Sequence, residues 1–76
     1  MSEDPYSQEV TRAGWLIDVG QYERAMQILA QLLAGYPDNA SITYKVMALT
    51  HIRMDRFGDA EAAARKALAV QQNDPD

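Results

Sequence analysis

Hydrophobic residues recur at three- and four-residue steps in four stretches of this chain, and helix-breaking residues separate the stretches. The breakers are Pro5, Gly20, Gly35 with Pro37, Asp55 with Gly58, and Pro75. No stretch shows the alternation of apolar and polar residues that is typical of a strand. The pattern therefore predicts four helices, over about Pro5–Val19, Tyr22–Ala34, Ala40–Met54 and Phe57–Val70.

Local signals at the helix ends support these boundaries. Asp4 before Pro5 is a predicted N-cap followed by a first-turn proline, whose missing N–H would be unpaired there anyway. Gly35 is placed to end the second helix in a left-handed conformation, and Asp38 or Asn39 can cap the third. Because only short links join the helices, consecutive helices are expected to lie antiparallel.

The apolar residues of each helix predict the core. The first and third helices carry them on more than one side, so each is expected to contact more than one neighbour. The apolar residues of the four helices are Val10, Ala13, Gly14, Leu16, Ile17 and Val19; Tyr22, Ala25, Met26, Leu29, Leu32 and Leu33; Ile42, Val46, Met47, Leu49 and Ile52; and Phe57, Ala60, Ala63, Ala64, Ala67, Leu68 and Val70. Glu61 and Arg65, four residues apart, are expected on an outer face.

The second and fourth helices repeat one design at a fixed spacing. The pairs that lie 35 residues apart are Tyr22 and Phe57, Ala25 and Ala60, and Leu32 and Ala67. A repeat of one helix pair near this length is typical of the tetratricopeptide family, which the sequence resembles over nearly the whole chain. The resemblance rests on Gly20, Tyr22, Ala25, Leu29, Leu32 and Pro37 in the first unit, and on Tyr44, Met47, Ala48, Phe57, Ala60, Ala64 and Ala67 in the second.

This resemblance implies an all-α domain over residues 1–76, with two antiparallel helix-turn-helix units stacked as a short right-handed superhelix. Unit one is expected over about 5–37 and unit two over about 40–72, with acidic flexible ends at 1–4 and 73–76. Stacking is also expected on physical grounds, because one helix pair cannot cover its own apolar faces. Small residues at Ala25, Ala60 and Ala64 are expected to let helices approach closely.

Some positions depart from the family's pattern. Glu9 replaces the leading aromatic residue of unit one, Arg12 and Ala13 replace a leucine–glycine pair, and Asp55 replaces the turn glycine of unit two. Two units leave both ends of the stack uncovered, and the last residues, NDPD, would suit the start of another helix. We therefore expect either a fragment of a longer repeat protein or a domain that covers its open end by self-association.

Composition and charge narrow the function classes. The 76 residues suffice for one small domain without a large catalytic pocket, and there is no cysteine for a disulfide or a thiolate metal site. The net charge of −4 is explained by four acids in the terminal segments, Glu3, Asp4, Asp74 and Asp76. Lys and Arg are not clustered, so nucleic-acid binding is not expected. The absence of a signal sequence and of a long apolar run favours a cytoplasmic protein without direct membrane binding.

Motifs of catalysis are missing as well. The sequence has no cysteine nucleophile, glycine-rich phosphate loop, paired histidines or serine elbow, so no enzyme, cofactor or metal site is expected. His51 is interpreted as a hydrogen-bonded core or interface residue. Trp15 is expected to pack against the second helix, with a binding anchor as the alternative. Met26, Met47 and Met54 are interpreted as core fillers, with a promiscuous groove as the alternative.

The family resemblance also implies where a partner would bind. In tetratricopeptide proteins the first helix of each unit lines a groove that holds an extended peptide or a partner helix. Carried over to this chain, the predicted groove residues are Val10, Gly14, Ile17, Ile42, Lys45, Leu49, Ile52 and Arg53, with Ser7 and Asp18 at two further positions. Gly14 and Leu49 stand where the family's carboxylate-clamp members have asparagines, so that clamp is not expected. The apolar groove, with Lys45 and Arg53 at its rim, suits an amphipathic helix or apolar peptide with some acidic residues.

These observations predict a protein–protein interaction module that acts as a scaffold or adaptor, expected to be part of a longer repeat protein. One alternative is a small bacterial secretion-type chaperone that holds a helical subunit in a one-to-one complex. Another is self-association as a homodimer. In each case the partner is another protein or a second copy of this chain.

Overall fold

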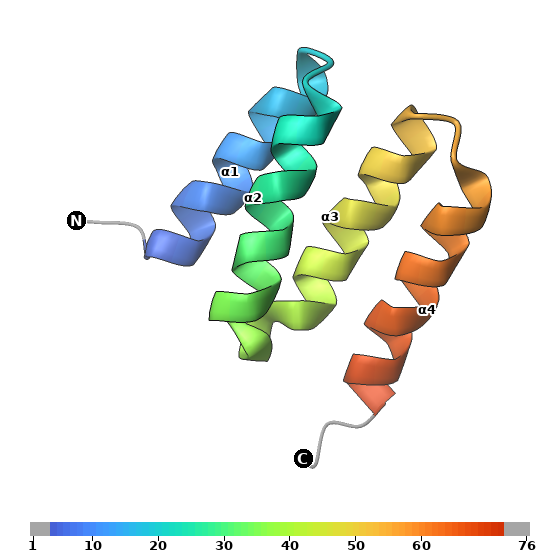
Figure 1. The fold of residues 1–76 in the computed structure, drawn as a ribbon. Helices are drawn as coiled ribbons and strands as arrows, with labels where there is room; N and C mark the ends of the chain where they lie inside the picture. The colour runs from blue at the N-terminus through green and yellow to red at the C-terminus, as the bar shows by residue number, and fades with distance from the viewer. Residues whose placement is uncertain (1–3, 73–76) are drawn as a thin grey trace.

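The computed structural model describes residues 4–72, so the predicted flexible ends, apart from residue 4, lie outside the described residues. Residues 4–72 form four α-helices. Figure 1 shows them side by side, each running antiparallel to the one before it. They are α1 (Pro5–Asp18), α2 (Tyr22–Gly35), α3 (Ala40–Arg53) and α4 (Phe57–Gln72), with the short 3-10 helix η1 (Pro37–Asn39) before α3. Residues 4–72 contain no strand, and the predicted all-α fold of two helix-turn-helix units is confirmed.

The 35-residue period of the sequence is also the period of the helices. Both α1 and α3, and both α2 and α4, begin 35 residues apart. Each residue of unit two (α3 and α4) therefore has a counterpart 35 positions earlier in unit one (α1 and α2). Helices that follow one another pack together, and α1 also touches α3, whereas α4 packs within the described part of the chain only against α3.

The start of α1 is fixed by the predicted cap. The Asp4 carboxylate accepts a hydrogen bond from the Ser7 backbone N–H at 2.7 Å, and Pro5 occupies the first turn. Hydrogen bonds from the Ser7 side chain and, to a smaller extent, from the Ser7 backbone N–H stabilise the charged carboxylate and lower the pKa of Asp4 below its usual 3.8.

The turns within the two units have the same geometry, although their residues differ. Gly20 and Asp55, which are counterparts, both adopt a positive φ, of 84° and 60°. In each turn the following amide bonds back to a carbonyl in the last turn of the helix, which closes the helix end. The two bonds are Gln21 N to Leu16 O and Arg56 N to His51 O, each 2.8 Å long. Asp55 therefore occupies a left-handed position that is unstrained only for glycine.

The predictions for the link between the units are wrong. Gly35 is the last residue of α2, its φ is not positive, and the chain leaves the helix through Tyr36, whose φ and ψ are −134° and 69°. Asn39 makes no side-chain capping bond, and its φ and ψ of −104° and 15° are near-helical. The reason is that Pro37 begins a 3-10 turn which runs directly into α3, so a cap residue with extended backbone has no place.

The main core lies between α1 and α2 and beneath α3. Its buried members are Tyr6, Ala13, Leu16, Ile17, Ala25, Leu29 and Leu32, with Val46 and Met47 of α3 packed against them. Tyr6 was not predicted from the sequence. Its hydroxyl lies 2.9 Å from Oγ1 of Thr43, and its ring centroid lies 5.5 Å from that of Tyr36, so Tyr6 ties α1 to α3.

The packing of α4 on α3 uses small residues. The buried residues of this contact are Ala48, Ala60, Ala63 and Ala67, and side chains of this size let the two helices approach closely. The expectation that Ala64 lets helices approach closely is wrong, since Ala64 is exposed, and Phe57 and Leu68 are exposed as well, by 63% and 54%. They lie on the side of α4 that no other helix of residues 4–72 covers.

Candidate protein-binding groove

A hollow of about 430 Å³ lies between α1 and α3, at the place where the sequence predicts a groove. Its lining residues are Val10, Thr11, Gly14, Trp15, Ile17 and Asp18 of α1 and Val46 and Leu49 of α3. The hollow thus brings together four of the eight predicted groove residues, Val10, Gly14, Ile17 and Leu49, and one of the two further positions, Asp18. Most of its lining is apolar, and the acid Asp18 lies at one side.

The other four predicted residues continue this face along α3. Ile42, Lys45, Ile52 and Arg53 are all exposed, and steps of three, four and seven residues place them on the same side of α3 as Leu49. Ile17 differs from the rest because its side chain is only 2% exposed and belongs to the core. Ile17 therefore forms the floor of the hollow, and the roles of all these residues in partner binding stay predictions.

Trp15 lies elsewhere than expected. Its side chain is 63% exposed, so the expectation that it packs against the second helix is wrong for most of the ring. On one side Trp15 lines the hollow between α1 and α3, and on the other it borders a depression of about 400 Å³ shared with Arg24 and Ile28 of α2. Trp15 lies three residues before Asp18, a predicted groove position, so the two share a helix face. This spacing could have indicated that Trp15 lies at the groove.

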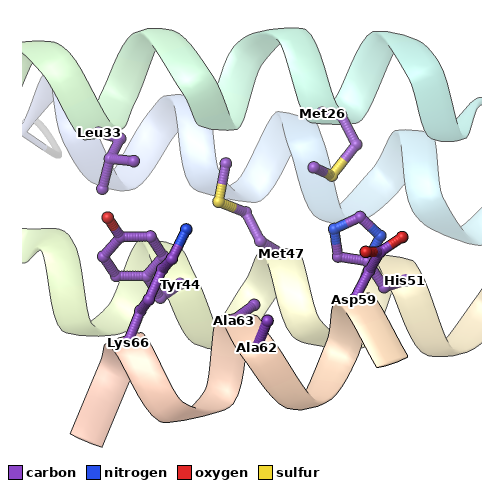
Figure 2. A pocket seen from close by; sticks show the side chains of 9 residues that line it. All are labelled: Met26, Leu33, Tyr44, Met47, His51, Asp59, Ala62, Ala63 and Lys66. Atoms are coloured by element: carbon purple, nitrogen blue, oxygen red, sulfur yellow. The ribbon is translucent and has the colours of Figure 1, made fainter. Parts of the chain in front are cut away.

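A second hollow, of about 370 Å³, lies on the opposite side of α3, where α2 and α4 face one another without touching. Figure 2 shows Met26 and Leu33 of α2 above it, Tyr44, Met47 and His51 of α3 along its floor, and α4 below. The sequence reasoning missed this hollow. The signal was present in the spacing of Tyr44, Met47 and His51, which places them on one helix face.

Charged groups lie at the two ends of this second hollow. Lys66 lies over the ring of Tyr44 with its Nζ 5.9 Å from the ring centroid, an attractive cation–π geometry. Asp59 lines the other end, near His51 (Figure 2). His51 is half-buried and its Nδ1 is enclosed without a hydrogen-bond partner, so the expected hydrogen-bonded histidine is not found.

Within residues 4–72, no group of three or more His, Asp or Glu side chains is placed to hold a metal ion. The same part of the chain has no helix that is long and apolar enough to cross a membrane. The arrangement consists of hollows and exposed apolar side chains on a helical scaffold, which suits contact with another polypeptide.

Comparison with known proteins agrees with this architecture. Neither a curated protein nor a solved structure matches the chain. A family model for the tetratricopeptide repeat matches residues 16–76, which is most of the sequence and includes three of the four helices in full. Tetratricopeptide repeats are in general protein-interaction modules without catalytic activity. The chain therefore belongs to the tetratricopeptide repeat family, whose members bind other proteins.

Proposed function

We propose that this protein binds a peptide or an amphipathic helix of another protein on the groove face, which we define as the hollow between α1 and α3 together with the exposed side of α3. The groove face comprises Val10, Gly14, Ile42, Lys45, Leu49, Ile52 and Arg53. The observation that carries the proposal is the continuity of an apolar hollow of about 430 Å³ with three exposed aliphatic side chains, Ile42, Leu49 and Ile52. A partner with an apolar face would remove this surface from water.

Gly14 supports the proposal through the space it leaves. A Cβ atom built on Gly14 would have no other atom within 4 Å, so packing does not require a glycine there. A glycine inside a helix costs about 0.5–1 kcal/mol relative to alanine. We infer that the missing side chain keeps the middle of the hollow open for a side chain of the partner.

Charges on the groove face favour a partner with acidic residues. Lys45 and Arg53 lie four residues before and four residues after Leu49, so one cation flanks this apolar residue on each side along α3. Both side chains are exposed, and they would contribute to selectivity and association rate more than to affinity. An adaptor or scaffold role follows from this mode of binding, and a chaperone for a helical subunit would use the same face.

The experiment is a fluorescence-anisotropy titration with two synthetic amphipathic helices that share one apolar face. One peptide carries glutamates on its polar face and the other carries lysines. We expect the acidic peptide to bind at least about tenfold more tightly at low salt, with the difference shrinking as salt screens the charges.

The variant Leu49→Asp makes this experiment specific to the groove face. It places a charge in the apolar middle of the groove and is expected to weaken binding of the acidic peptide at least about thirtyfold, the loss of a binding hot spot. Helicity by circular dichroism should stay nearly unchanged, since Leu49 is 43% exposed. The matched control Leu68→Asp changes an exposed leucine of α4 and should leave peptide affinity unchanged. Equal loss in both variants, or loss of helicity in Leu49→Asp, would defeat the assignment.

A further inference from the structure

The two ends of the helix stack expose different amounts of apolar side chain. The repeat allows a direct comparison, because each position of unit one has a counterpart in unit two. Ile17 of unit one is 2% exposed, whereas its counterpart Ile52 is 47% exposed. Leu29 is fully buried, whereas its counterpart Ala64 is exposed. In unit one these positions are covered when α3 packs on the pair α1 and α2. The corresponding surface of unit two has no such cover within residues 4–72.

On α4 this uncovered surface forms a single stripe along the helix. Phe57, Glu61, Ala64 and Leu68 follow one another at steps of four, three and four residues, which places them on one face. We call these four residues the α4 stripe. Its two large apolar side chains, Phe57 and Leu68, stand near its ends, and both are more than half exposed.

One charged residue of the α4 stripe, Glu61, lies between its apolar ends, and Arg65 lies beside the stripe. Glu61 accepts a hydrogen bond from Arg65 at 3.0 Å, and both side chains are well exposed. An apolar residue near each end, with a carboxylate and a guanidinium near the middle, makes the stripe complementary to itself when a second copy is turned by a two-fold rotation. In that antiparallel arrangement Phe57 meets Leu68 of the second copy, and Glu61 meets Arg65 of the second copy.

We propose that two copies of this chain associate through the α4 stripe as a two-fold homodimer. Small Ala64 lies near the crossing point and permits close approach of the two helices. Each Glu61–Arg65 pair joins its symmetry mate in a four-charge cluster at the rim, where a network contributes more than an isolated surface pair. The proposal concerns a different surface from the groove face and does not depend on the proposed function.

The opposite end of the stack argues against head-to-tail assembly. There Trp15, Leu16 and Ile28 line a depression of about 400 Å³ together with Arg12, Arg24 and Gln27. If the α4 stripe of another copy covered this end, two guanidinium groups would lose water, while the stripe offers only the carboxylate of Glu61. Uncompensated burial of charge is strongly unfavourable. A closed two-fold dimer is therefore favoured over an open-ended stack.

Sedimentation equilibrium across about two decades of protein concentration tests the proposal. The wild-type chain is expected to fit a monomer–dimer equilibrium, and Leu68→Glu is expected to raise the dissociation constant at least about a hundredfold. The matched control Trp15→Glu changes an exposed apolar residue at the other end and should leave association unchanged. Three results would each overturn the proposal. The wild-type chain could stay monomeric, Leu68→Glu could leave the dimer unaffected, or Trp15→Glu could lose association.

Charge reversal tests the antiparallel register. Glu61→Arg alone and Arg65→Glu alone each place like charges opposite one another and should weaken the dimer about tenfold. The double variant Glu61→Arg with Arg65→Glu restores opposite charges and should return the dissociation constant to within about threefold of wild type. Circular dichroism of all three variants separates this effect from a change in helix content. A double variant that is folded but as weak as the single ones would contradict the register.

Discussion

The two units of this protein share one backbone plan but bury side chains of very different size. Unit one encloses Leu16, Ile17, Leu29 and Leu32 between its helices and α3. The buried residues between α3 and α4 are alanines instead, and the buried Thr50 lies in α3. The counterparts of Leu29 and Leu32 are the alanines Ala64 and Ala67. The counterpart of Ile17 is Ile52, which is exposed. A repeat can therefore keep its geometry while one unit supplies most of the apolar burial.

The difference has a physical cause in what lies next to each unit. The outer side of α2 is covered by α3, so large side chains there gain about 0.8 kcal/mol for each methylene group removed from water. The corresponding side of α4 has no neighbour among residues 4–72, and its large side chains stay exposed. Close approach over alanines then holds α4 to α3, and Phe57 and Leu68 remain available to a second copy.

The largest expected change in stability comes from a variant that disrupts the packing of unit one. Leu29→Ala removes a fully buried side chain from the main core and should lower the free energy of unfolding by about 2–5 kcal/mol, from lost burial and the cavity left behind. Chemical denaturation monitored by circular dichroism measures the change. The counterpart Ala64→Leu adds a side chain at an exposed position and should shift stability by less than about 0.5 kcal/mol. If both variants lower the free energy of unfolding by a similar amount, the two units bury these positions to a similar extent.

The next effect tests whether alanines are required between α3 and α4. Ala67 is buried at 2% exposure, and its counterpart in unit one is Leu32. Ala67→Leu would force the two helices apart and should cost about 1–3 kcal/mol of unfolding free energy. Ala69→Leu, on an exposed side of the same helix, is the matched control and should cost less than about 0.5 kcal/mol. A stabilised Ala67→Leu variant would show that the contact is loose instead of closely packed.

The smallest expected change in stability comes from exchanging residues in the two turns within the units. Asp55 adopts a positive φ that its counterpart Gly20 adopts without strain. Asp55→Gly should therefore raise stability by up to about 1 kcal/mol, whereas Gly20→Asp should lower it by about the same amount. Thermal unfolding of the two variants measures both signs together. If Asp55→Gly is destabilising, the aspartate contributes an interaction at this turn that outweighs its backbone strain.

Helix positions and the repeat could be predicted from the sequence because their signals are local. The breakers placed every helix within a residue or two, and the Asp4 cap with Pro5 is present as expected. The end of α2 was predicted less well, since Gly35 and Pro37 each suggest a stop and only the three-dimensional path decides between them.

Burial could not be predicted with the same success, because it depends on what covers each face. The spacing of Phe57 and Leu68 shows that they share a side of α4, but the sequence alone does not say whether another helix packs there. Tyr6 was missed for the opposite reason. Its burial depends on Thr43, which lies 37 residues further along the chain. The groove residues follow from the family resemblance, and the structure adds that Ile17 is a core residue beneath the groove.

The most direct test of the proposed function is to map where a peptide binds. In an NMR titration of the isotope-labelled protein with the acidic amphipathic helix, backbone amide shifts should change at Gly14 and Val10 of α1 and at Leu49 and Ile52 of α3. Amides along α4 from Ala62 to Lys66, which borders the second hollow, should stay in place. Shifts confined to that hollow or to α4 would contradict the groove face as the binding site.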